Sequence, residues 1–447
     1  MRDLFNRLVT LTDHAELFGL DSTIDLIGFE NNRLKSLNTL ASRGVAIRAV
    51  SKNRMGQAYA SDLRDPDKLA TRAAELASLG DPPEFDFAPA APLTHVPLVD
   101  PALESMSIES LTTLAQEAID TVRQSDPAAL VHFLGERTLE RITVMTSTGA
   151  DYAYDRLYFT GALSVERVEG RNIVQLAKYH KGIRCPRSLE PLARDIAADL
   201  ALARQTRPFT PGKLNIIFAP AALADVLMAF TGGIDAEMVA RKVSPLHDKL
   251  GQSILDPRIT ILDDPFHPDG IFSAPFDDEG TVTRRKAIVE RGVLKEFIGD
   301  RKSCTRLGIA PTGNGFRLTP FDLYKTYSQG ISADTTNLVI EPGTTPVEEL
   351  RSKVGSGIEI HQINGILLGD LITGDFSGSL EVAYRIDGGQ RVGRIKDAMI
   401  SGNFFDIFRS QLIDLSSERS WSGTFGGCSG AFLLPYIALE GIDIAGA

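Results

Sequence analysis

This sequence of 447 residues is poor in cysteine and has no long apolar run. Its three cysteines, Cys185, Cys304 and Cys428, are odd in number and far apart, which disfavours a framework of disulfide bonds. No stretch approaches the roughly 18 consecutive apolar residues that a membrane-spanning helix needs. Charged residues interrupt the first 14 positions, where a signal peptide would be apolar. We therefore expect a cytoplasmic protein with no membrane association.

The chain also has no excess of basic residues over acidic ones. Lys and Arg number 47 against 58 Asp and Glu, which gives a net charge of −11. Binding to a phosphate backbone relies on clustered Lys and Arg, so direct binding to nucleic acid is not expected. Apolar residues make up 43% of the chain and charged residues 23%, as in ordinary globular proteins. The length suffices for two or three domains.

The first half of the chain alternates between strand-like and helix-like segments. Residues 24–29 and 44–50 have the apolar character of strands, and Asp65 with Pro66 opens a helix that reaches Leu79. Residues 81–101 contain six prolines and no periodicity. This composition indicates a linker, or an extended crossing segment, that divides the N-terminal region.

Helix and strand signals return after this proline-rich run. Ser107 can cap a second helix, and residues 141–146 and 152–168 are rich in the aromatic and β-branched residues of strands. A third helix ends near Gln205. Residues 207–212 then break the pattern with two prolines and a glycine. We place the main domain boundary there, between an N-terminal region, 1–206, and a C-terminal domain, 213–447.

The C-terminal half is denser in strand and turn signals. Residues 214–218 predict a buried strand, and Pro220 suits the first turn of the helix that follows. Thr345 and Glu348 have the spacing of a capping box, and Asn403 can cap a later helix. Further strands are predicted at 357–363, 380–386 and 430–434. The expected fold class is α+β, with a sheet-and-helix region followed by a β-rich, sandwich or barrel-like domain.

An acidic turn, Asp277, Asp278 and Glu279 followed by Gly280, precedes a predicted hairpin at 285–298. Clustered carboxylate oxygens suit a hard cation or acid–base chemistry. A turn that orders itself by accepting backbone N–H groups explains the same residues. Spacing does not decide between these two interpretations.

The hairpin and the segments after it carry clearer local signals. Arg291 and Gly292 supply the tight turn, because glycine readily adopts positive φ. Residues 300–307 then predict a short helix that ends at Gly308. The glycine-rich turn that follows contains Thr312, Gly313 and Asn314.

Three of these segments, 276–280, 288–294 and 311–314, occur in the order found in the TldD/PmbA family. The C-terminal half therefore resembles that family of DNA gyrase modulators, which are classed as metallopeptidases. The resemblance implies that Asp277, Asp278, Glu279, Gly280, Thr312, Gly313, Asn314 and Cys428 contribute to substrate binding or to a subunit interface. In catalytic relatives a cysteine at the position of Cys428 is thought to complete the metal site.

The metal motif of the family, His-Glu-x-x-x-His, is missing from this sequence. Its two histidines would share one helical face to hold the metal, with the glutamate as general base. Alignment through Arg241 and Lys242 places Met228 and Gly233 at the histidines and Ala229 at the glutamate. The resemblance is therefore to the PmbA (TldE) type of subunit, with no metal and no catalytic residue in this chain and zinc in its partner.

The histidines that are present offer a weaker site. His247 and His267 flank Asp263 and Asp264, but their separation makes exposed loop histidines the preferred interpretation. His361 lies in a predicted strand, where a hydrogen-bonded or solvent-facing side chain is expected rather than a metal ligand.

Taken with the resemblance, these features predict a non-catalytic PmbA/TldE-like subunit. Its expected partners are a metal-bearing TldD-like subunit and unfolded peptides or peptide precursors, with a homodimer as the alternative in isolation. Extended substrate would add as a strand to an exposed sheet edge. Two rival functions stay open, a stand-alone peptidase with a rearranged site and a peptide-binding regulator without proteolytic activity.

Overall fold

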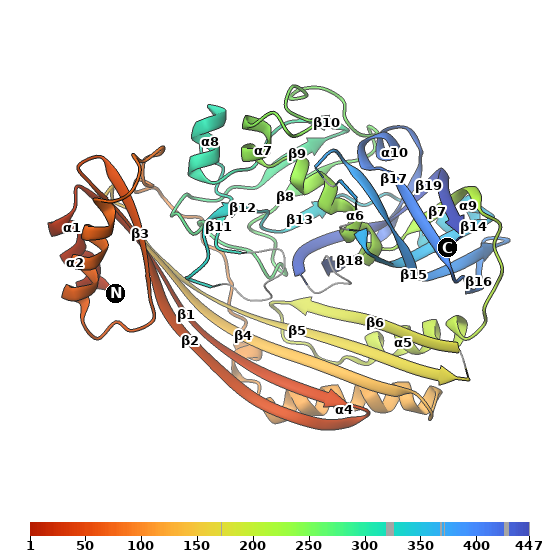
Figure 1. Cartoon of the computed structure of the whole chain (residues 1–447). Coiled ribbons are helices and arrows are strands. Elements are labelled where there is room, and N and C mark those ends of the chain that lie inside the picture. The colour runs from red at the N-terminus through yellow and green to blue at the C-terminus, as the bar shows by residue number, and fades with distance from the viewer. Residues whose placement is uncertain (171, 319–325, 367–368, 371, 424–428, 447) are drawn as a thin grey trace.

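Two large β-sheets organise the protein in the computed structural model (Figure 1). The structure describes residues 1–170, 172–318, 326–366, 369–370, 372–423 and 429–446. Among the described residues, the first six strands form one sheet, and eleven of the strands from β7 onward form a second sheet. No pairing between described strands joins the two sheets.

The N-terminal sheet is antiparallel, with strand order β3-β2-β1-β4-β5-β6. Its strands are β1 (His14–Glu30), β2 (Arg33–Ser51), β3 (Arg54–Ala60), β4 (Leu130–Thr146), β5 (Asp151–Glu169) and β6 (Asn172–Gly182). Asn31 and Asn32 form the β1–β2 turn with φ of 49° and 68°, as a tight hairpin requires. The four strands predicted in this region are confirmed and are longer than predicted.

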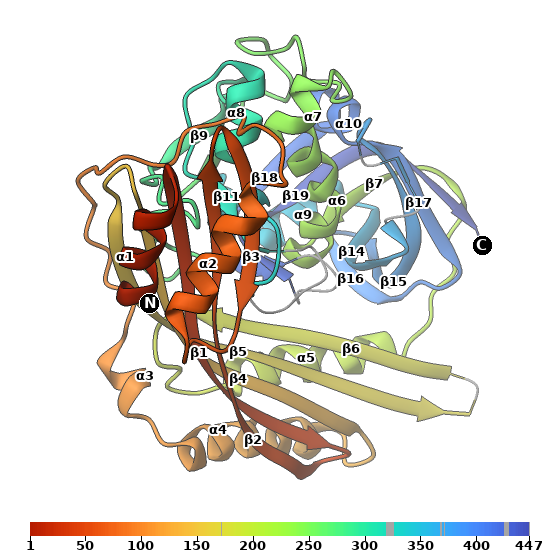
Figure 2. The same ribbon diagram turned by 60° about the vertical axis from the view of Figure 1, so that its left-hand side comes forward.

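Helices cover one end and one face of this sheet (Figures 1 and 2). They are α1 (Arg2–Leu11), α2 (Pro66–Ala77), α3 (Pro101–Ser105), α4 (Ile108–Ser125) and α5 (Glu190–Ala203). Ser107 caps α4 by accepting the N–H of Ser110, as predicted. Apolar side chains of α4 and α5 pack on Phe133 and Phe159 to form the core beneath the sheet. The opposite face therefore lies toward the C-terminal domain.

The proline-rich segment 81–101 crosses the N-terminal sheet in an extended conformation. It forms isolated bridges through Asp81 to Met55 and through Pro89 to Gly149. The backbone N–H of Leu157 also donates to Leu98 O at 2.9 Å. These bonds satisfy backbone groups in a segment that has no helix or strand before α3 begins at Pro101.

The C-terminal sheet contains a closed ring of strands. Its members are β7 (Gly212–Phe218), β14 (Gly357–Asn364), β15 (Asp375–Asp387), β17 (Ala398–Asn403) and β19 (Ser429–Gly446). Each strand pairs with the next, and β19 pairs back with β7. The remaining strands of the sheet are β8 (Ile261–Asp263), β9 (Lys286–Glu290), β10 (Val293–Leu294), β13 (Leu338–Ile340), β16 (Gln390–Arg394) and β18 (Leu412–Gly423). The predicted α+β class with a barrel-like second domain is confirmed.

The described part of the C-terminal domain has five helices, of which α6, α9 and α10 contact barrel strands, and a short β11–β12 pair lies outside the barrel. The helices are α6 (Pro220–Gly233), α7 (Ala236–Ala240), α8 (Arg301–Leu307), α9 (Val347–Val354) and α10 (Phe404–Ser410), and the pair is β11 (Gly315–Phe316) with β12 (Ser332–Ala333). Helix α6 contacts β14, β18 and β19. Gly308 ends α8 with φ of 75° and Asn403 caps α10, both as predicted, and Asp300 supplies the N-cap of α8.

Two local predictions were wrong. The capping box does not form, because Pro346 is the N-cap of α9 and the Thr345 hydroxyl instead donates to Asp414 at 2.7 Å. The second hairpin strand was predicted to run from 293 to 298, but regular pairing is limited to β10. Gly292, with φ of 78°, forms the predicted turn.

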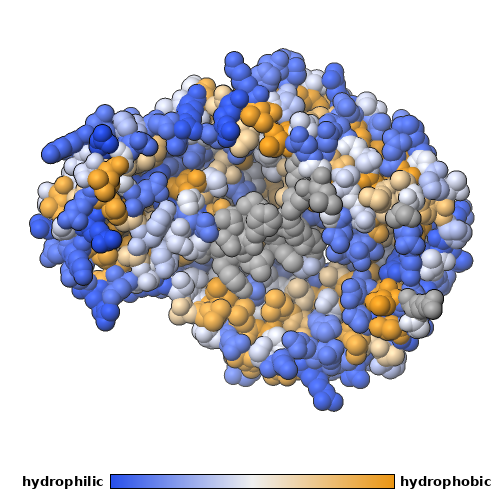
Figure 3. Space-filling model, viewed as in Figure 1, coloured by the Kyte–Doolittle hydropathy of each residue, from blue (hydrophilic) through white to orange (hydrophobic). Residues whose placement is uncertain are grey.

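No helix among the described residues is long and apolar enough to cross a membrane. Polar and charged side chains dominate the face shown in Figure 3, with apolar side chains gathered along its lower part. Exposed apolar side chains of the N-terminal sheet include Leu34, Leu37, Leu40, Leu130 and Leu134.

Candidate functional site

The acidic turn lies between the two sheets and is buried. Asp277 is 1% exposed, and Asp278 and Glu279 are fully buried. Asp277 accepts the backbone N–H groups of Glu279, Thr281 and Gly315 at 2.9–3.0 Å. This carboxylate therefore orders its own turn and fixes it to β11, as the self-ordering interpretation requires.

The other two carboxylates connect the turn to more distant segments. Asp278 accepts the backbone N–H of Arg317 at 2.7 Å, and Glu279 accepts that of Arg301 at 2.6 Å. The second oxygen of Glu279 accepts from Arg48 Nη2 at 2.9 Å. Since Arg48 lies on β2, Glu279 joins the C-terminal domain to the N-terminal sheet.

Burial shifts the pKa values of Asp277 and Glu279 in this turn. Burial raises the pKa of Glu279, and the positive charge of Arg48 opposes that rise. Burial also raises the pKa of Asp277, and the neighbouring charge of Glu279 raises it further. Arg48 additionally pairs with Glu16 of β1, so two carboxylates share one guanidinium.

Gly280 allows the turn to approach the N-terminal sheet closely. Its φ of 77° lies in the region that favours glycine. A Cβ atom at this position would lie 3.0 Å from Val144 of β4 and 3.5 Å from Ala88. A larger residue would therefore both strain the turn and separate the two regions.

Thr312, Gly313 and Asn314 form a buried neighbouring turn. The Thr312 hydroxyl hydrogen-bonds the backbone of Gly299 at 2.9 Å. Asn314 accepts from Lys286 at 2.9 Å and donates to Asp263 at 2.8 Å. Gly313 has φ of 75°.

Lys286 and Asp263 are themselves paired at 2.8 Å with neither side chain exposed. The structure thus brings the acidic turn and this second turn together, through the bond between Asp277 and Gly315. A role of either turn in binding substrate or a partner stays a prediction. Cys428 lies outside the described residues.

The positions predicted to replace the metal motif lie on α6 and are packed against the core. Ala229 is fully buried, and Met228 is partly buried against the same core cluster. A Cβ atom on Gly233 would lie 3.0 Å from the ring of Phe405 and 3.4 Å from Leu246. These residues do not fit a zinc ion, since they supply no imidazole, thiolate or carboxylate and the Cβ position of the third is already crowded by Phe405.

The described residues contain no group of three or more His, Cys, Asp or Glu side chains placed to hold a metal ion. His247 is exposed, as predicted. His267 is half-buried rather than exposed, because its ring packs edge-on against Trp421 with centroids 5.0 Å apart. Burial lowers the pKa of His267. His361 is satisfied by a 2.8 Å hydrogen bond to Glu359, as predicted.

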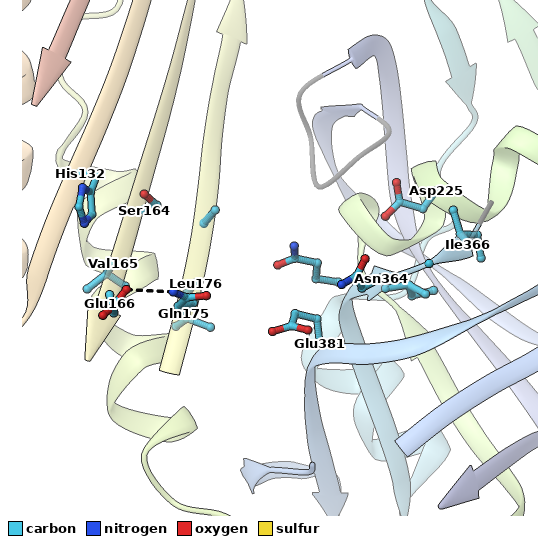
Figure 4. Close-up of a pocket in the computed structure, with 14 residues that line it drawn as sticks. His132, Ser164, Val165, Glu166, Gln175, Leu176, Asp225, Asn364, Ile366 and Glu381 are labelled. Atoms are coloured by element: carbon cyan, nitrogen blue, oxygen red, sulfur yellow. Dashed lines mark hydrogen bonds between the residues drawn. The ribbon is translucent and has the colours of Figure 1, made fainter. Parts of the chain in front are cut away.

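A cleft of about 810 Å³ separates β6 from the C-terminal domain (Figure 4). His132, Ser164, Glu166 and Gln175 from the N-terminal sheet line one wall. The other wall consists of Asp225 on α6, residues 362–366 and Glu381 on β15. The α6 helix thus contributes to this cleft through Asp225, three residues before Met228.

A second hollow of about 310 Å³ continues the cleft along β6. Leu176, Ala177 and Gln362 line both hollows. The second hollow extends past Pro220 at the start of α6 to Trp421 on β18. Sequence reasoning missed this cleft, because its walls come from segments far apart in the chain and no spacing pattern connects them.

Comparison with known proteins agrees with this architecture. A model of the PmbA/TldA metallopeptidase C-terminal domain matches residues 211–446, and a model of PmbA/TldA metallopeptidase domain 1 matches residues 15–77. The first match alone covers more than half of the chain. The barrel and these matches define a metallopeptidase-related protein of two regions. The chain belongs to the PmbA/TldD family.

Individual relatives are distant in sequence but similar over most of their length. The chain is 25% identical to uncharacterized protein MJ0231 of Methanocaldococcus jannaschii over 399 residues, 86% of this chain and 88% of the relative. It is 24% identical to the metalloprotease TldD homolog of Haemophilus influenzae, covering 91% and 86%. The crystal structure of TldE from Thermococcus kodakarensis has the same fold, with a TM-score of 0.91 at 22% identity and full coverage of both chains.

Proposed function

We propose that this chain is a non-catalytic, PmbA/TldE-type subunit that pairs with a metal-bearing TldD-like subunit and holds extended peptide for it. The observation that carries this proposal is the packing of α6. Along this helix only Asp225 and Thr231 have polar side chains, so the helix offers no pair of metal ligands on one face.

The surroundings of Gly233 also support the proposal that α6 holds no metal ion. A Cβ atom on Gly233 would lie 3.0 Å from the ring of Phe405, so a histidine there would require that ring to move. The remaining described residues form no alternative metal group. A stand-alone metallopeptidase with a rearranged site gains no support from this arrangement. Zinc and the hydrolytic step belong to the partner subunit in this proposal, and both subunits work in the cytoplasm.

The peptide-holding role is supported by two open strand edges in the cleft. Strand β6 is the last strand of its sheet, and its residues 175–178 line the cleft. On the facing wall, β7 pairs only with Ile358–Ile360 of β14, so residues 362–364 extend beyond it. Within the described chain, the backbones of 175–178 and 362–364 bond only to β5 and β15, respectively. An extended peptide can bond to such edges through its main chain.

The test is reconstitution with a TldD-like chain from the same genome. The two chains are co-expressed with a tag on this subunit alone, and the purified material is assayed for zinc and for cleavage of an unfolded peptide. We expect a stable complex in which cleavage requires both chains and a His-Glu-x-x-x-His motif in the partner. Peptide cleavage by this chain alone, lost with a chelator, would support the stand-alone peptidase instead. Failure to form a complex while binding peptide would support the regulator.

A further inference from the structure

The cleft beside β6 is lined by carboxylates on both of its walls. Glu166 lies on β5 and Glu381 on β15, on opposite sides of the opening (Figure 4). Asp225, which is 1% exposed, lies on the same side as Glu381. Neither Lys nor Arg is among the described residues that line this hollow. Low-dielectric walls bearing charge of one sign concentrate ligands of the opposite sign.

Glu166 and Glu381 form no ion pair with another described residue. Glu166 accepts a hydrogen bond from the uncharged amide of Gln175 at 2.9 Å. Neither Glu166 nor Glu381 has a described Lys, Arg or His nitrogen within 4.0 Å. The negative charge of Glu381 attracts the guanidinium of Arg394 electrostatically. Arg394 donates its hydrogen bond to Ile173 O at 3.1 Å. Both carboxylates therefore remain able to accept a cation from a ligand.

The strand register shows where such a cation would lie. Glu166 is directly opposite Gln175 in the β5–β6 pair, so the two side chains share one face of the sheet. Neighbouring strands lie about 4.8 Å apart. A peptide that adds to the β6 edge places one side chain beside Gln175, about 10 Å from the backbone of Glu166. The long, flexible side chains of Lys and Arg suit that distance, and Glu381 approaches from the facing wall.

We infer that this cleft selects extended peptides that carry a basic side chain at the position beside Gln175, with Glu166 and Glu381 as the residues that determine this specificity. The inference rests on the proposed peptide-holding function and names its substrate class. It does not depend on metal chemistry, because the charges act on binding alone. The two hollows together follow β6 for several residues, so the remainder of the peptide binds through its main chain.

The experiment measures binding of three fluorescein-labelled, unstructured ten-residue peptides to the full-length chain by anisotropy. The peptides are identical except for a central pair of Lys, Gln or Glu residues separated by one residue. We expect the Lys peptide to bind about tenfold more tightly than the Gln peptide and the Glu peptide to bind most weakly. Raising the salt concentration should reduce the difference between the three.

Variants that remove charge then test whether Glu166 and Glu381 cause the preference for the Lys peptide. The double variant Glu166→Gln, Glu381→Gln should bind the Lys and Gln peptides with affinities within about twofold of each other. Its matched control, Glu75→Gln, Glu117→Gln, removes the same charge from exposed positions on α2 and α4 and should keep the tenfold preference. Melting temperatures of both variants check that the fold is retained.

The outcomes separate this inference from the function on which it rests. If no peptide binds at any charge, the peptide-holding function itself is wrong. If all three peptides bind equally, or if the Glu166→Gln, Glu381→Gln variant keeps the preference for Lys, charge selection in this cleft is wrong and peptide holding stands.

Discussion

Arg48 of β2 and Glu279 of the acidic turn form a 2.9 Å ion pair that joins the two regions of the protein, with side chains 6% and 0% exposed. Arg48 simultaneously pairs with Glu16 on β1. Because a buried charge without a partner is costly, this three-residue group makes the docking of the C-terminal domain onto the N-terminal sheet depend on all three side chains.

Replacing Arg48 tests that dependence. Arg48→Met removes the cation that pairs with Glu279 and leaves Glu16 beside Arg317, whose Nη2 lies 4.0 Å away. We expect the free energy of unfolding to fall by about 3–5 kcal/mol. Urea denaturation measures the change. Arg33→Met, at an exposed position of the same strand, is the control and should change stability by less than about 0.5 kcal/mol. Equal stability of the two variants would mean that the ion pair does not hold the regions together.

Rebuilding the metal motif on α6 is expected to fail. In the triple variant Met228→His, Ala229→Glu, Gly233→His, the new side chain at 233 meets the ring of Phe405. Gly233→His alone should lower the free energy of unfolding by about 1–3 kcal/mol through overpacking. Thr231→His, a half-buried position on the same helix, is the control for helix propensity. A folded triple variant that retains about one zinc per chain after dialysis would show that the packing does not block the site.

Asp278 is expected to act in structure rather than in catalysis. Asp278→Asn keeps the shape of the side chain but removes the negative charge of the carboxylate whose oxygen accepts the Arg317 N–H. We expect a loss of about 1–3 kcal/mol in stability, measured by thermal and urea unfolding. In the complex with a TldD-like partner, kcat should stay within about tenfold of the unsubstituted complex. A variant that folds and pairs normally but loses more than about a hundredfold in kcat would assign Asp278 to the chemistry.

Asp334 should make stability depend on pH. Burial raises the pKa of this carboxyl to about 6, above its value in the unfolded chain. Its contribution to stability is therefore present below about pH 4 and is lost as the pH rises through about 6. Relative to Asp334→Asn, the unsubstituted protein should lose up to about 3 kcal/mol over that interval and nothing further above pH 7. Parallel stability curves for the two proteins would contradict the raised pKa.

Local sequence signals predicted local structure well. Asp300, Gly308 and Asn403 occupy the helix caps that their types favour, and Arg291 with Gly292 forms the predicted turn. Each of these features depends on a few neighbouring residues. The capping box failed where a distant residue competed, because Asp414 accepts the hydroxyl that would otherwise have capped α9.

The parts of the site that depend on tertiary structure could not be predicted in the same way. Glu16 and Arg48 face each other only through the register of a long hairpin, and Glu279 joins them from more than 200 positions away. The opposed carboxylates Glu166 and Glu381 likewise belong to different sheets. The sequence alone shows that the histidines of the metal motif are missing. The contact between the Phe405 ring and Gly233 could be found only in the folded structure.

The zinc content of the isolated chain tests the central claim most directly. The full-length protein is expressed in zinc-supplemented medium, dialysed against metal-free buffer and measured by elemental analysis alongside its complex with a TldD-like partner. The account predicts about one zinc per complex and well under about 0.1 per isolated chain, because Met228, Ala229 and Gly233 supply no imidazole, thiolate or carboxylate. About one zinc retained per isolated chain would contradict it.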